Sequence, residues 1–152
     1  MKYKLPFLFV LFVGFISNKL LAQDLDFNTF LSSGIIESSG LIYLNGNLIT
    51  HNDSGGEAAL YEIDSLNGSI LRTVYISNAT NQDWEDICYD QDYIYIGDFG
   101  NNGGTRTNLK VYRLSILDYL NTGNDTVSAD TINFSYSNQV DFTLGSNNTN
   151  FD

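Results

Sequence analysis

The chain has 152 residues, a formal net charge of −11, 43% hydrophobic and 14% aromatic residues, and a single Pro, Cys and His. This composition excludes low-complexity disorder, a small domain stapled by disulfides, and a nucleic-acid-binding protein that relies on basic patches. One His and one Cys are also too few for a zinc site of His and Cys ligands, so a bound metal would have to be held by oxygen atoms.

The first 22 residues have the pattern of a secretory signal peptide. Lys2 and Lys4 precede an apolar run over 5–16, and 20–22 (LLA) supplies the small-residue end of a cleavage site. An uncleaved anchor is the weaker interpretation, because about 12 apolar residues fall short of the roughly 20 that span a bilayer. Cleavage would remove three of the seven basic residues and no acid, leaving a net charge of −14. The sequence therefore predicts an acidic protein, secreted or at the cell surface, with no stable membrane span.

After a lead-in over 23–33, short strand-like runs alternate with turn residues. Asn45-Gly46 readily takes the positive φ angles of a type I′ turn, so 41–44 and 48–50 are predicted to form a hairpin. Cys88 falls in an apolar run and is predicted to be a buried small hydrophobe. Further strands are predicted at 59–63, 70–76, 87–89, 93–96, 109–114 and 131–136, with a short helical turn only at 116–120. The pattern predicts an all-β protein.

The predicted strands repeat along the chain. A shift of 46 residues places 40–43 over 86–89, and five residues more place 60–63 over 111–114. The segment 80–83 (TNQD) recurs as 149–152 (TNFD). Four-stranded units of about 40–50 residues, each opened by an acidic segment, are typical of β-propeller blades. An antiparallel sandwich and a small barrel are the alternatives that the same alternation permits.

The repeat predicts two four-stranded antiparallel blades, at 34–77 and 79–137, and the start of a third at 148–152. Propellers typically have about 4–8 blades, because the ring closes by contacts between neighbours. We therefore expect 34–152 to be an incomplete part of a larger propeller, with the remaining blades as its first partner.

Four motifs occur in order along this region: ESSGL at 37–41, HNDSGG at 51–56, DWEDI at 83–87 and GDFGNN at 97–102. In this combination they resemble the opening blades of secreted bacterial proteins of the TolB-like six-bladed propeller superfamily, over about 34–152. The resemblance implies a six-bladed propeller, often exported with a C-terminal type IX secretion sorting domain. More distant relatives of similar shape include calcium-dependent lactonases and phytases, with a metal at the channel mouth, but that relation is by fold and says little about function.

Two loops mimic catalytic motifs. The stretch 52–56 (NDSGG) is like the nucleophile loop of trypsin-like proteases, but the chain has no second His to act as a base. The stretch 98–104 (DFGNNGG) lacks the Lys-Ser/Thr of a phosphate-binding loop and two oxygen ligands of an EF-hand. Both are predicted to be turns. Arg106 is predicted to pair with Asp98 or another local carboxylate.

The segment 83–86 (DWED) is the strongest functional candidate. The two-residue period of a strand places Asp83 and Glu85 on one face and Trp84 and Asp86 on the other. Converging carboxylates repel unless a cation or a basic group neutralises them or their pKa values rise, so Asp83, Trp84, Glu85 and Asp86 are the predicted ligand-binding residues. The alternative is that the acids cap turns while Trp84 packs in the core between blades.

Two functions follow. The first is a non-catalytic secreted binding or scaffold module for a protein, glycan, small molecule or ion outside the cytoplasm, and not for nucleic acid. The second is a calcium-dependent hydrolase of the lactonase or phosphoesterase type, in which Glu37, Asp53, Glu85 and Asp98 hold a Lewis-acidic cation. Calcium is the candidate cofactor. The first is preferred, because no base, nucleophile or phosphate-binding cluster of Lys and Arg is visible.

Overall fold

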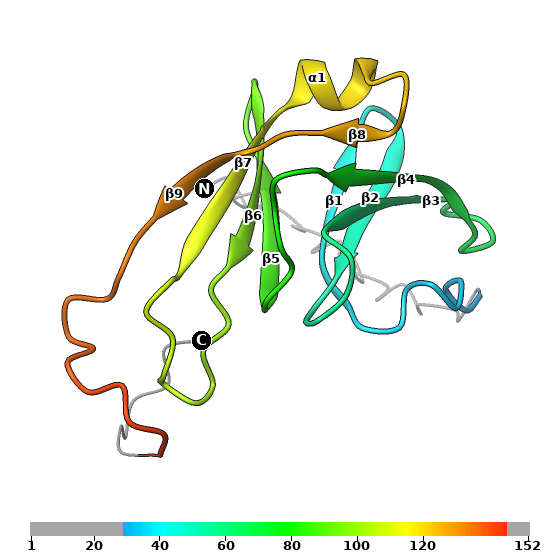
Figure 1. Ribbon diagram of the computed structural model, residues 1–152. Coiled ribbons are helices and arrows are strands. Elements are labelled where there is room, and N and C mark those ends of the chain that lie inside the picture. The colour runs from blue at the N-terminus through cyan, green and yellow to red at the C-terminus, as the bar shows by residue number, and fades with distance from the viewer. Residues whose placement is uncertain (1–28, 146–152) are drawn as a thin grey trace, which may run out of the picture.

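The computed structural model describes residues 29–145, whose strands form two sheets that lie side by side (Figure 1). The expectation of an all-β protein is confirmed, since nine strands and one short helix make up the regular structure of this range. None of its helices is long and apolar enough to cross a membrane. The predicted signal peptide at 1–22 and the predicted start of a third unit at 148–152 lie outside the described residues.

The first sheet, sheet A, has the strand order β1-β2-β3-β4-β8. Its first four strands form an antiparallel meander within the predicted unit 34–77, and the turn between β1 and β2 has Asn45 and Gly46 at φ 49° and 91°, which confirms the predicted hairpin. A short β8 pairs parallel with β4, which the sequence pattern did not predict. The strands are β1 (Ser38–Leu44), β2 (Asn47–Asn52), β3 (Ala59–Ile63), β4 (Ile70–Ile76) and β8 (Thr126–Val127).

The second sheet, sheet B, is antiparallel throughout, with the order β5-β6-β7-β9. The helix α1 (Ile116–Asn121) follows β7 and confirms the predicted helical turn; it begins where Ser115 Oγ accepts a hydrogen bond from Asp118 N at 3.2 Å. After α1 the chain adds β8 to sheet A and then returns to sheet B as β9 (Figure 1). The strands are β5 (Trp84–Tyr89), β6 (Tyr93–Asp98), β7 (Lys110–Ser115) and β9 (Asp130–Asn133).

A polar network holds α1 and the turn that leads to β8 against sheet A. Tyr119 is fully buried, and its Oη donates to Glu62 Oε1 at 2.9 Å. Arg72 Nη1 lies 3.4 Å from the same oxygen, and Arg72 Nε pairs with Asp125 at 2.6 Å. Arg72 Nη2 also donates to the carbonyls of Tyr119 and Thr122, both at 3.3 Å. The buried Glu62 carboxylate therefore has donors from both β4 and α1, which joins the helix to the sheet.

The main core lies between the two sheets. Here β1 and β5 run beside each other, and Ser39 Oγ donates to the Glu85 carbonyl at 2.7 Å. Gly40 has φ 50°, and a Cβ there would lie 2.9 Å from Ile87 N, so this close approach requires glycine. The core consists of Ile42, Ile49, Leu60, Val74, Ile76, Trp84, Ile87, Ile94, Ile96, Tyr112, Leu114, Tyr119, Val127 and Ala129.

Cys88 is exposed, so the prediction that it is buried is wrong. In β5, Ile87 is 4% exposed and belongs to the core between the sheets. The strand period turns Cys88 to the opposite face of sheet B, and no other sheet of residues 29–145 covers that face.

Candidate functional site

Three carboxylates converge where sheet A meets sheet B. Asp53 directly follows β2, Asp83 directly precedes β5, and Glu85 is the second residue of β5. One carboxylate oxygen from each lies within 4.8 Å of the others, and all three residues are half-buried. The predicted common face of Asp83 and Glu85 is thus observed, and Asp53 joins them from 30 positions earlier in the chain. We call these three residues the acidic cluster.

Backbone contacts hold the acidic cluster together. Trp84 N donates to the Asp53 carbonyl at 2.9 Å, which ties the end of β2 to the start of β5. Gly100 N donates to the Asp83 carbonyl at 3.1 Å, and a Cβ on Gly100 would overlap Glu85 Oε1 and the Asp83 carboxyl group. The bare backbone at Gly100 therefore leaves the space that the two carboxylates occupy.

One oxygen of the acidic cluster has no partner. Asp53 Oδ1 is buried and makes no hydrogen bond. An ionised carboxylate oxygen withdrawn from water is unfavourable unless a donor or a cation compensates it. Three carboxylates at this spacing also repel one another. A hard divalent cation such as Ca²⁺, which prefers oxygen ligands, satisfies both demands, so the three residues fit such an ion. Of the four calcium ligands predicted from the sequence, Asp53 and Glu85 belong to the cluster.

Asp98 lies beside the acidic cluster but is paired with cationic side chains. It is fully buried, with Oδ1 2.7 Å from Arg106 Nη2 and Oδ2 3.7 Å from Lys110 Nζ. The predicted pairing of Arg106 with Asp98 is therefore confirmed. Asp98 Oδ1 also accepts a hydrogen bond from Asp83 N at 3.2 Å, and Arg106 Nη1 donates to the Gly100 carbonyl at 2.7 Å. Asp98 and Arg106 position the acidic cluster, and the structure does not place Asp98 among its converging oxygens.

The other predicted site residues lie outside the acidic cluster. Glu37 is exposed, and its carbonyl accepts a hydrogen bond from Asp53 N at 2.8 Å, so it contributes through its backbone. Asp86 is exposed, and its Oδ1 accepts a hydrogen bond from Ile87 N at 2.8 Å. Trp84 is fully buried in the core, which is what the alternative interpretation of the DWED segment expected.

His51 forms part of the core behind the acidic cluster. It is fully buried, its Nδ1 donates to the Asn52 carbonyl at 3.0 Å, and its ring meets Trp84 edge to face with centroids 5.6 Å apart. Burial lowers the pKa of His51 and outweighs the nearby Asp86 and Asp53 charges. The chain's single His is therefore a neutral core residue that a substrate in solvent does not reach.

Substitution of Gly100 by alanine is expected to lower the free energy of unfolding by about 1–3 kcal/mol, because the added methyl group overlaps the Asp83 and Glu85 carboxyl groups. Urea denaturation measures the change. Gly123→Ala is the matched control, because a Cβ at Gly123 meets no atom within 4 Å. Equal midpoints for the two variants would contradict the crowding at Gly100.

A scan of protein-family models and searches of curated proteins and of solved structures found no match to this chain. The geometry of the acidic cluster is therefore the basis of the functional inference.

Proposed function

We propose that the protein is a secreted, non-catalytic binding module in which the acidic cluster holds a calcium ion between two propeller-type blades. The observation that carries the proposal is the convergence of Asp53, Asp83 and Glu85, with the Asp53 Oδ1 atom buried and without a hydrogen-bond donor. The four-strand meander shared by β1–β4 and by β5, β6, β7 and β9 supports the blade interpretation. The acidic composition and the N-terminal pattern support export to a compartment rich in calcium.

A cation at this position would join the two sheets. Asp53 belongs to the end of sheet A, while Asp83 and Glu85 belong to the start of sheet B. Because Ca²⁺ takes about 6–8 oxygen ligands, three half-buried carboxylates leave positions for water or for oxygens of a bound glycan, peptide or small molecule. Binding is favoured over hydrolysis because the single His is buried in the core and the buried Asp98 is already paired with Arg106.

Calcium is expected to raise the melting temperature of the chain after it has been stripped with a chelator. At a concentration 100 times the dissociation constant, the free energy of unfolding should rise by about 2.7 kcal/mol, because the ion binds only the folded state. Asp53→Asn and Glu85→Gln are each expected to weaken calcium binding at least about tenfold, which corresponds to about 1.4 kcal/mol. Differential scanning fluorimetry and isothermal titration calorimetry measure the two effects.

Asp92→Asn is the matched control, because it also removes one negative charge but lies in the exposed turn between β5 and β6. It should bind calcium as the unaltered chain does. A chain that melts at the same temperature with calcium and with chelator would refute the cation site. Calcium-dependent turnover of lactones or phosphoesters would instead favour the hydrolase alternative.

A further inference from the structure

The first two strands of the two sheets pair in the same register. In sheet A, Ile42 pairs with Ile49 across β1 and β2. In sheet B, the residues 46 positions later, Cys88 and Tyr95, pair across β5 and β6. Residues paired across neighbouring strands lie on one face of their sheet, so each pair occupies the corresponding face of its own sheet.

The third and fourth strands of the two sheets, β3 and β4 in sheet A and β7 and β9 in sheet B, also have corresponding residue pairs. Leu60 pairs with Val74 across β3 and β4, and Val111, 51 positions after Leu60, pairs with Ile132 across β7 and β9. The row Ile42, Ile49, Leu60, Val74 of sheet A thus has its counterpart in the row Cys88, Tyr95, Val111, Ile132 of sheet B. We call the second row the outer face of sheet B.

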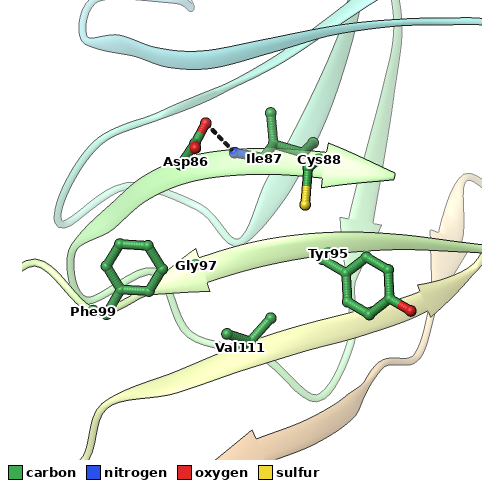
Figure 2. Close-up of a pocket in the computed structure, with 7 residues that line it drawn as sticks. All are labelled: Asp86, Ile87, Cys88, Tyr95, Gly97, Phe99 and Val111. Atoms are coloured by element: carbon green, nitrogen blue, oxygen red, sulfur yellow. Dashed lines mark hydrogen bonds between the residues drawn. The ribbon is translucent and has the colours of Figure 1, made fainter. Parts of the chain in front are cut away.

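The two rows differ in burial. The sheet A row is 7%, 1%, 0% and 0% exposed, because sheet B packs on it. On the outer face of sheet B, Cys88 is exposed, Ile132 is 45% exposed, and Tyr95 and Val111 are half-buried. Figure 2 shows Cys88, Tyr95 and Val111 around a hollow on this face. Sheet B therefore presents an apolar face of the kind that sheet A buries.

The face of sheet A that packs on sheet B and the outer face of sheet B each carry an aromatic ring at the same position. His51 projects from the end of β2 in sheet A, and the indole of Trp84 packs against it from the incoming sheet B. The counterpart of His51 in sheet B is Gly97, and a Cβ there would overlap the Phe99 ring. The Phe99 ring therefore takes the place of the His51 side chain, and Figure 2 shows it beside Gly97. An incoming aromatic residue has the same kind of partner on both faces.

From these correspondences we infer that the outer face of sheet B is the docking surface for a further antiparallel sheet of the same repeat. The occupant packs on Cys88, Tyr95, Val111 and Phe99 as sheet B packs on sheet A. Its lead-in is of the type found at 149–152 (TNFD), which repeats the segment 80–83 (TNQD) that leads into β5. The inference rests on the proposed blade-like repeat of the two sheets and not on the calcium ion.

The test uses the chain from residue 23 and an extended chain in which residues 84–145 are repeated directly after Asp152. The segment 149–152 then leads into the added copy as 80–83 leads into β5. The added copy carries Ser in place of its own Cys88, so that iodoacetamide reports only on the original thiol. We expect alkylation of Cys88 to be at least about tenfold slower in the extended chain, because the added sheet covers it.

Two variants of the extended chain complete the test. Tyr95→Asp in the original copy should restore fast alkylation, because it places a charge in the docking surface. Tyr43→Asp should leave the protection intact, because Tyr43 is 61% exposed on sheet A. Unchanged alkylation in the extended chain overturns the inference, whether or not the added copy folds. Protection of Cys88 that grows with protein concentration in the chain 23–152, without the added copy, would also overturn it, because a second copy would then be the occupant.

The same samples separate this inference from the proposed function. Calcium stabilisation is measured on the chain without the added copy, and Cys88 protection is measured in the presence of chelator. Protection without calcium stabilisation would remove the cation site alone, and calcium stabilisation without protection would remove the docking surface alone.

Discussion

Replacement of Trp84 by alanine is expected to lower the free energy of unfolding by about 3–5 kcal/mol, the range for deletion of a large buried aromatic side chain. Trp84 is fully buried between the sheets, where its ring packs on His51 and lies 5.9 Å from the Tyr112 ring. Its Nε1 also donates to the Thr80 carbonyl at 3.1 Å. The deletion therefore leaves a cavity and removes one of the two hydrogen bonds that the Thr80 carbonyl accepts, the other coming from Tyr112 Oη at 3.3 Å.

Urea denaturation followed by circular dichroism measures this effect. Tyr43→Ala is the control, because it also removes a large aromatic side chain from a strand but at a position 61% exposed. It should change the free energy of unfolding by less than about 1 kcal/mol. Similar losses for the two variants would mean that Trp84 is not the residue that joins the sheets. Calcium affinity should also fall in Trp84→Ala, because the neighbouring Asp83 and Glu85 would lose their fixed positions.

Replacement of Arg72 by alanine is the second large expected effect, a loss of about 2–3 kcal/mol. It leaves the buried Glu62 carboxylate without its cation, although Tyr119 Oη at 2.9 Å and Asn47 Nδ2 at 3.0 Å still donate to it. The loss is smaller than the roughly 3–5 kcal/mol of a fully buried pair, because the Arg72 side chain is 21% exposed. Burial and then the Glu62 charge raise the pKa of Tyr119, so this phenol stays protonated and acts as a donor.

A double-mutant cycle tests the assignment. Glu62→Gln in the Arg72→Ala background removes the uncompensated charge and should recover part of the loss. Arg113→Ala is the matched control, because Arg113 also pairs with a carboxylate at 2.7 Å, but its partner Asp130 has a side chain 68% exposed. An exposed pair of this kind contributes at most about 1 kcal/mol. Additive effects of the Glu62 and Arg72 substitutions would contradict the network.

The features that could be predicted from the sequence are governed by local chemistry. The Asn45-Gly46 turn takes positive φ at both residues because Asn tolerates this conformation and Gly has no Cβ to clash, whatever surrounds the hairpin. The helix α1 begins after a Ser cap. The Arg106–Asp98 pair joins the last residue of β6 to a residue only eight positions later, in the loop that follows. Each of these features depends on a few consecutive residues, and those residues are visible in the sequence.

Other features depended on which elements lie side by side. The sequence carries no signal for the pairing of β8 with β4. That pairing depends on the contacts between Arg72 and α1, which hold the chain beside sheet A just before β8 begins. Cys88 lies in an apolar run that looks like a core strand, but its exposure depends on whether a sheet covers its face. Apolar alternation shows that a strand has a face to bury and does not identify the partner.

The acidic cluster combines both kinds of feature. The two-residue strand period by itself placed Asp83 and Glu85 on a common face. Asp53 is predicted from the sequence as a calcium ligand together with Glu85, and the tertiary structure brings it to both Asp83 and Glu85, because the burial of Trp84 between the sheets aligns the end of β2 with the start of β5. The tertiary structure also buried Asp98, whose charge the Arg106 guanidinium compensates, and left the exposed Glu37 side chain outside the cluster. Strand period determines the direction of a side chain, and packing between distant strands determines which side chains meet.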